Sequence, residues 1–210
     1  MQKSINHPQI KQQKDIRIAI ILPVYNTSTY LKECLDSLLN QTHKNYLVFA
    51  VDDGSTDNSP AILDEYQEKN VHIKVTHSSN SGVSIARNIA LKEIEDDGQF
   101  DLVTFCDSDD IVSPDLLSLY AQYKVKYNAD FITVGYKSFY KTGIKIKSKN
   151  SHTPQFIEGH DILRFGYTDY LRTSPAYSKF TGNICLDAKK IFGLRFDPLL
   201  KKRRRPRLST

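Results

Sequence analysis

Short apolar runs alternate along the first two thirds of the chain with segments whose apolar residues recur at helical spacing. The runs are rich in β-branched residues and only a few residues long, which predicts buried strands. We expect these strands over residues 16–24, 46–51, 71–75, 102–106 and 131–134.

The segments between these runs predict helices. Thr27 or Ser28 can cap the first helix, and Pro60 suits the first turn of the second. A third helix follows Gly82, and a fourth is expected over residues 115–127. Regular alternation of strands and helices predicts an α/β fold, with a mostly parallel central sheet and helices on both faces.

The pattern weakens beyond about residue 135. Residues 137–149 alternate basic and apolar side chains, which predicts an exposed hairpin or a flexible loop. One further helix is expected near residues 161–167. Because the chain has no repeat and no obvious linker, we expect one domain over residues 16–200, preceded by a frayed or disordered stretch at 1–15.

The composition is ordinary for a soluble globular protein, with 40% hydrophobic and 25% charged residues. The longest apolar run covers about seven residues, whereas roughly 20 are needed to cross a bilayer. The polar N-terminal stretch lacks the apolar core of a signal peptide. We therefore expect a cytoplasmic chain. Three scattered cysteines have no metal-ligand spacing and are expected to be reduced thiols: Cys34, Cys106 and Cys185.

The net charge of +5 is concentrated at one end of the chain. Six positive side chains lie within residues 201–207, and without them the remaining chain is close to neutral. This location argues against a nucleic-acid-binding domain. We expect a basic tail at 201–210 that allows peripheral contact with an anionic membrane surface.

Two acidic clusters stand directly after predicted strands, at residues 51–57 and 106–110. Ligands of open α/β sheets bind beyond the carboxyl ends of the strands. Carboxylates at that edge suit sugar hydroxyls, the edge of a base, or a metal ion bound to phosphate. Taken alone, either cluster could instead be a turn followed by a helix cap, since Asp, Gly and Ser dominate turns.

The two acidic clusters belong to a series of five motifs along the chain. They are ILPVYN at 21–26, LLNQT at 38–42, VDDGSTD at 51–57, NSGVSIARN at 80–88 and DSDD at 107–110. In this order and spacing the chain resembles the GT-A-fold family 2 glycosyltransferases over roughly residues 16–200. The resemblance implies a nucleotide-diphosphate-sugar donor, expected to be a UDP-sugar, and inverting transfer to an acceptor hydroxyl.

The resemblance also implies roles for the residues that would hold the nucleoside. Asp53 is expected to accept a hydrogen bond from the imide of uracil, with Asp52 beside it as a further substrate-binding candidate. Tyr25 is expected to pack against the nucleoside, and Pro23 to shape the wall. Arg87 could meet either the base or the anionic diphosphate, because its planar fork suits both.

A second group of roles concerns the diphosphate. By the same resemblance, Asp107 faces the ribose and Asp109 holds a divalent ion that bridges the two phosphates. An oxygen-only site with phosphate partners favours the hard cations Mn²⁺ or Mg²⁺. Asp109 is therefore the catalytic candidate, since the ion neutralises charge on the departing nucleotide. Residues 16–135 would bind the nucleotide sugar, and 136–200 would form part of the acceptor site.

The family pattern breaks near the end of the chain. Family members usually carry the catalytic base in a Glu-Asp pair, and RFDPLLKK at 195–202 resembles the approach to it. A basic run at 203–207 follows instead. Our interpretation is a truncated product, because one base inserted in an adenine tract converts codons for Lys-Lys-Gly-Glu-Asp into Lys-Lys-Arg-Arg-Arg. A natural basic tail is the alternative. Since neither Asp187 nor Asp197 sits in the family position, we expect donor binding with weak or no transfer.

Three functional readings follow. The first is a glycosyltransferase of surface polysaccharide or lipopolysaccharide synthesis, acting on a saccharide or lipid-linked saccharide. The second is a catalytically inactive nucleotide-sugar-binding domain. The third, a sugar nucleotidyltransferase, would need a Gly-rich basic loop after the first strand, where PVYN stands at 23–26.

Overall fold

The computed structural model describes residues 11–134, 137–138, 147–148 and 184–198. Its centre is a six-stranded sheet in the order β3-β2-β1-β4-β8-β5. The strands are β1 Ile18–Val24, β2 Tyr46–Asp53, β3 Ile73–Ser78, β4 Leu102–Phe105, β5 Phe131–Thr133 and β8 Ile184–Asp187.

Four neighbouring strands of this sheet run parallel. β1 pairs with β2 and β4, so that Ile18 lies opposite both Tyr46 and Leu102, and β2 pairs with β3. β8 is antiparallel to both of its neighbours, β4 and β5. The carboxyl ends of β1, β2 and β4 therefore meet at one edge of the sheet.

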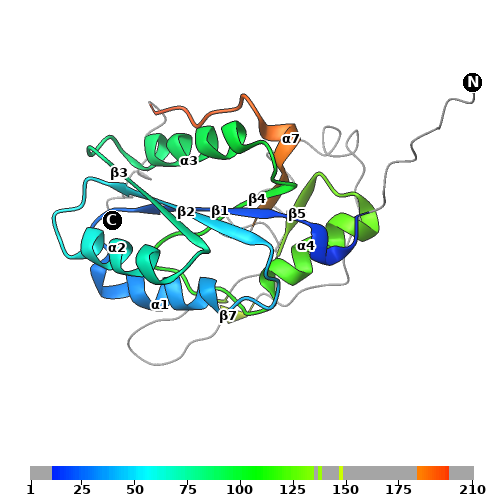
Figure 1. Ribbon diagram of the computed structural model, residues 1–210, viewed down its shortest axis with the longest axis horizontal. Helices are drawn as coiled ribbons and strands as arrows, with labels where there is room; N and C mark the ends of the chain where they lie inside the picture. The colour runs from blue at the N-terminus through cyan, green and yellow to red at the C-terminus, as the bar shows by residue number, and fades with distance from the viewer. Residues whose placement is uncertain (1–10, 135–136, 139–146, 149–183, 199–210) are drawn as a thin grey trace, which may run out of the picture.

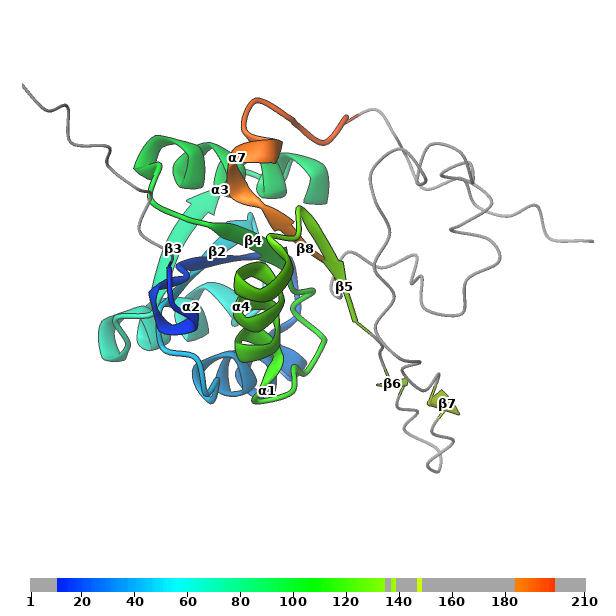
Figure 2. The same ribbon diagram turned by 90° about the vertical axis from the view of Figure 1, so that its right-hand side faces the viewer.

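Helices cover both faces of the sheet (Figure 1). α3 (Val83–Asp97) and the short α7 (Ala188–Ile191) lie on one face. Figure 2 shows the other face covered by α1, α2 and α4. These three helices span Ser28–Leu39, Ser59–Lys69 and Leu116–Tyr127. A 3₁₀ turn, η1 (Gln13–Asp15), precedes β1.

The two faces have separate cores, and β1 contributes to both. Ile18 and Ile20 belong to the core beneath α1, α2 and α4, whereas Ala19 and Ile21 belong to the core beneath α3. Every residue of β1 is buried. Successive side chains of a strand point to opposite faces, so a strand covered on both sides must be apolar throughout. The unbroken apolar run of β1 follows from this.

The predicted α/β fold is confirmed. The five expected strands and the first four expected helices are present, although β2 runs on to Asp53 and β3 runs from Ile73 to Ser78. β6 (Lys137–Ser138) and β7 (Lys147–Ser148) pair antiparallel, as the ends of a hairpin would. The helix expected near 161–167 lies outside the described residues.

β8 was not predicted from the sequence. This strand lies between β4 and β5, so the strand expected at 131–134 pairs with β8 rather than with β4. Only Cys185 of its four residues is buried. A strand this short, with partly exposed side chains, has no distinctive apolar run.

Among the residues that the structure describes, no helix combines the length and the apolar character needed to cross a membrane.

Candidate functional site

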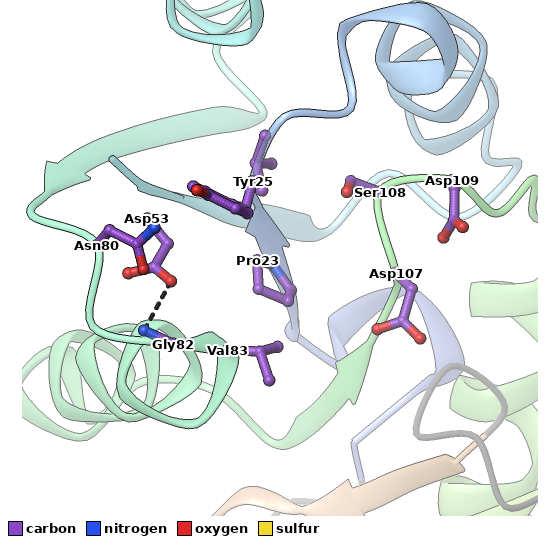
Figure 3. A pocket seen from close by; sticks show the side chains of 10 residues that line it. Pro23, Tyr25, Asp53, Asn80, Gly82, Val83, Asp107, Ser108 and Asp109 are labelled. Carbon is purple, nitrogen blue, oxygen red and sulfur yellow. Dashed lines mark hydrogen bonds between the residues drawn. The ribbon is translucent and has the colours of Figure 1, made fainter. Parts of the chain in front are cut away.

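A pocket of about 380 Å³ opens at the carboxyl ends of β1, β2 and β4. Figure 3 shows Asp53 at one end of it and Asp107 and Asp109 at the other. Pro23 and Tyr25 lie between the two ends, at the end of β1. The pocket thus brings together five of the seven residues nominated from the sequence.

The loops around the pocket are joined by the side chain of Asn26. This residue has φ 52°, in the left-handed region that Asn tolerates better than most residues. Its Oδ1 accepts hydrogen bonds from the backbone nitrogens of Thr56 at 2.8 Å and Asp57 at 3.3 Å, and its own nitrogen donates to Ser55 Oγ at 3.0 Å. The turn after β1 is therefore tied to the turn after β2.

Asp57 ties the starts of two helices to the same loop. Its carboxylate accepts from the backbone nitrogens of Ser28, at the start of α1, and Ser59, at the start of α2, each at 2.9 Å. Burial opposes ionisation here, but hydrogen bonds from Ser59 and Ser28 prevail and hold the pKa of Asp57 well below its usual range. The last residue of the VDDGSTD motif is therefore a structural anchor.

Asp53 has the same kind of role at the pocket end of β2. It is 3% exposed, and its two oxygens accept hydrogen bonds from the backbone nitrogens of Ser81 at 2.7 Å and Gly82 at 2.8 Å. These bonds fix the start of α3. Each carboxylate oxygen has two lone pairs, so acceptor capacity remains for a ligand in the pocket that Asp53 lines.

The structure places Asp52 outside the pocket lining. Its oxygens accept from the backbone nitrogen of Ser55 at 3.0 Å and lie 3.0 Å from His77 Nδ1. His77 also reaches Asp64 through Nε2 at 3.0 Å, and hydrogen bonds to Asp52 and then Asp64 raise the pKa of His77. Asp52 supports the loop after β2, whereas Asp53 is the residue of this pair that lines the pocket.

The glycine of this motif is required by close packing. Gly54 has φ +70°, and a Cβ there would lie 2.6 Å from the backbone nitrogen of Asn80. No side chain fits without moving the loop that leads to α3. Gly54 thus brings Asn80 to the pocket wall, where it lies close to Asp53 (Figure 3).

At the acidic end of the pocket, the side chain of one arginine lies among several carboxylates. Arg87, on α3, donates from Nη2 to Asp107 Oδ1 at 2.8 Å, with the two side chains 12% and 32% exposed. Asp109 is exposed and lines the pocket. Desolvation, with the charges of Asp107 and Asp109, raises the pKa of Asp110 to about 6. The carboxylates therefore leave an excess of negative charge at this end.

Two carboxylates at this end of the pocket could hold a divalent cation that takes its other ligands from phosphate and water. Within the described residues, no group of three or more acidic, His or Cys side chains could hold a metal ion. Asp107 and Asp109 supply two hard oxygen donors on one loop. Mg²⁺ and related cations are commonly held by one or two carboxylates while phosphate oxygens and water complete the shell. The residues present fit that arrangement.

Some residues predicted to belong to the site do not line the pocket, and some residues that line it were not predicted. Arg87 is absent from the lining and reaches the site through Asp107. Asn80 and Val83 line the pocket but were not nominated, although both belong to the NSGVSIARN motif. Asp187, considered as a base, caps α7 and forms an ion pair with Lys124 at 2.6 Å.

The cavity lies beyond the carboxyl ends of parallel strands, where ligands of open α/β sheets bind, and carboxylates stand at both of its ends. The family comparison is specific: the model for glycosyl transferase family 2 matches residues 19–195. The chain belongs to this family. The resemblance inferred from the five motifs is therefore confirmed.

Individual relatives agree with this assignment. The glycosyltransferase GlyA of Streptococcus pneumoniae is 41% identical over 125 residues, which are 60% of this chain and 17% of GlyA. TarS 1–349 of S. aureus has a TM-score of 0.64 at 22% identity, covering 90% of this chain and 52% of that one. The GT-A fold is therefore confirmed. The chain spans about half or less of the length of these relatives.

Two solved structures contain ligands. TarS 1–349 in complex with UDP-GlcNAc is 30% identical to the chain, with a TM-score of 0.55, and covers 61% of this chain and 37% of that one. The mannosyltransferase PcManGT from Pyrobaculum calidifontis, in complex with GDP-Man and Mn²⁺, is 20% identical with a TM-score of 0.51. It covers 62% of this chain and 39% of that one.

Proposed function

We propose that the pocket binds a UDP-sugar and that the chain transfers the sugar, with inversion, to an acceptor hydroxyl. The observation that carries the proposal is the spacing of the carboxylates, one at the β2 end of the cavity and two at the β4 end (Figure 3). The solved relative with UDP-GlcNAc is more similar to the chain than the relative with GDP-Man, which favours UDP.

Uracil is assigned to the Asp53 end. A buried carboxylate held by two backbone N–H groups is fixed in orientation and can accept the imide N–H of the base. Tyr25 is 46% exposed, so its ring is open to stack on the nucleoside. Such a stack removes apolar area from water and contributes about 1–3 kcal/mol.

The diphosphate is assigned to the Asp107 and Asp109 end, with Mn²⁺ or Mg²⁺. A bare diphosphate beside these carboxylates would be repelled, so a cation must accompany it. When bound, the cation neutralises charge that develops on the leaving nucleotide diphosphate. Asp109 would hold the cation, Asp107 would orient the ribose, and Arg87 would fix Asp107.

In-line displacement places the acceptor hydroxyl on the side of the sugar opposite the leaving diphosphate. Residues 136–200 would contribute to the acceptor site, and 16–135 would bind the donor. We assign the acceptor as a saccharide or lipid-linked saccharide of surface polysaccharide or lipopolysaccharide synthesis. The basic residues at 201–210 would allow contact with the inner face of the membrane.

A second candidate is a donor-binding domain with little or no transfer. One observation favours it: in the described part of the pocket, Asp53 is bonded to backbone nitrogens and Asp107 is paired with Arg87. Asp109 is assigned to the cation. None of these carboxylates is placed to take the acceptor proton, and general-base assistance contributes about 10²- to 10⁴-fold.

Calorimetry with UDP in the presence of Mn²⁺ tests the proposal. The chain should bind UDP with one site, and Asp53→Asn should weaken UDP more than it weakens GDP, because guanine presents a different hydrogen-bonding edge. Asp64→Asn is the matched control, since Asp64 lies outside the pocket on α2. Absence of UDP binding by folded wild-type protein contradicts the proposal. Release of sugar from a panel of UDP-sugars then separates the first candidate from the second.

A further inference from the structure

The segment after α7 is attached to α3 by a pair of hydrogen bonds made by one side chain. Asn88 Nδ2 donates to the carbonyl oxygen of Phe196 at 2.9 Å, and the nitrogen of Phe196 donates to Asn88 Oδ1 at 2.7 Å. We call these two bonds the Asn88–Phe196 clasp. The residues are 108 positions apart in sequence, and the amide satisfies both backbone groups of Phe196 as a neighbouring strand would.

The clasp fixes an aromatic ring against the binding site. The ring of Phe196 packs edge to face on Phe105, the last residue of β4, with the centroids 5.7 Å apart. The guanidinium carbon of Arg87 lies 5.5 Å from the centroid of the same ring. Phe196 is therefore held between β4 and the arginine that donates to Asp107.

The contact between Phe196 and Arg87 restrains the arginine side chain at the acidic end of the pocket. An arginine side chain is long and flexible, and holding its fork in one orientation costs conformational entropy. A cation over an aromatic face is attracted to the ring and restrained by it. The ring of Phe196 therefore helps to hold Arg87 in its geometry toward Asp107.

We propose that Asn88 and Phe196 are positioning residues of the donor site, which orient the Arg87–Asp107 pair for the metal-bound diphosphate. The proposal rests on the proposed function, whose diphosphate end it deepens. The chain of contacts runs from Asn88 to the backbone of Phe196, then from the ring to Arg87 and to Asp107. None of these contacts reaches the Asp53 end of the pocket.

The test compares two ligands on full-length variants. Asn88→Leu is neutral and similar in shape, and it removes both bonds of the clasp. Phe196→Leu keeps an apolar side chain but removes the aromatic face, and Phe196→Tyr restores that face. Arg195→Gln is the matched control, because Arg195 ties the same segment to α3 through Glu95 without contacting Arg87.

UDP with Mn²⁺ is measured by calorimetry, and the base uracil, which lacks the ribose assigned to Asp107, by ligand-observed NMR. Phe196→Leu should weaken UDP·Mn²⁺ by about two- to fivefold, the factor expected for a cation–π contact at a partly exposed site. Asn88→Leu should weaken it by about tenfold, since two partly buried backbone groups lose their partners. Uracil binding should stay unchanged in both variants, and Phe196→Tyr and Arg195→Gln should match wild type.

Each other outcome overturns the proposal. Equal weakening of UDP·Mn²⁺ and uracil would mean that the clasp only stabilises α3, whose start is bonded to Asp53. Unchanged UDP·Mn²⁺ binding in both Leu variants would mean that Arg87 needs no ring. A matching loss in Arg195→Gln would assign the effect to attachment of the segment in general. Wild-type protein that binds neither ligand contradicts the proposed function itself.

Discussion

Replacing Gly54 by alanine is expected to destabilise the chain and to weaken nucleotide binding together. Gly54 has φ +70°, and its Cβ would lie 2.6 Å from the backbone nitrogen of Asn80. The left-handed conformation alone costs alanine roughly 1–2 kcal/mol. Displacing the Asn80 loop adds the strain of an overpacked methyl group, about 1–3 kcal/mol. The total of about 2–5 kcal/mol corresponds to a fall in Tm of roughly 4–20 °C for a chain of this size.

Gly98→Ala separates the two contributions. Gly98 ends α3 with φ +68°, but its Cβ would lie 3.8 Å from the nearest atom, the carbonyl oxygen of Glu95. In this variant alanine must adopt the left-handed conformation but clashes with no neighbour, so the Tm should fall by roughly 2–8 °C. It should bind UDP with Mn²⁺ like wild type in calorimetry, while Gly54→Ala binds more weakly. Equal Tm values and wild-type UDP binding by both variants would refute the argument from close packing.

Three further predictions address single side chains of the same loops. Asp57→Asn should cost about 1–2 kcal/mol in urea unfolding, because one amide oxygen cannot serve two helix starts; a wild-type midpoint would contradict this. Because folding raises the pKa of His77, protonated His77 stabilises the folded state. This stabilisation is fully present below the ordinary pKa of histidine, 6.5, and is lost as the pH rises through the folded-state pKa. Wild-type unfolding free energy should therefore fall relative to that of His77→Gln between pH 6 and pH 8, and parallel pH curves would show that the contacts to Asp52 and Asp64 contribute nothing. Asp109→Asn should abolish the enhancement of UDP binding by Mn²⁺ without altering uridine binding, whereas an undiminished Mn²⁺ effect would place the cation elsewhere.

The central strands could be predicted from the sequence because burial on both faces leaves a plain signal. β1 is apolar at every position from Ile18 to Val24, and the helices beside it carry apolar stripes. β8 gave no such signal, since it has four residues and only Cys185 is buried. Its place between β4 and β5 depends on contacts that are distant in sequence. Local patterns therefore predicted the parallel part of the sheet and missed the antiparallel insertion.

The motifs that form the site could be predicted from the sequence, but the direction in which each of their side chains points could not. Asp52 and Asp53 are equivalent in the motif, yet neighbouring residues of a strand face opposite sides, so only one can line the pocket. The structure assigns this place to Asp53 and turns Asp52 to His77. The pairing of Asn88 with Phe196 could not be foreseen, because nothing in either segment specifies a partner 108 residues away.

A crystal structure with UDP and Mn²⁺, with anomalous scattering used to locate manganese, tests the central claim most directly. Uracil should lie against Asp53 and Tyr25, and one manganese peak should lie between Asp109 and the diphosphate. A peak remote from Asp107 and Asp109, or a nucleotide bound outside the cavity at the ends of β1, β2 and β4, would contradict it.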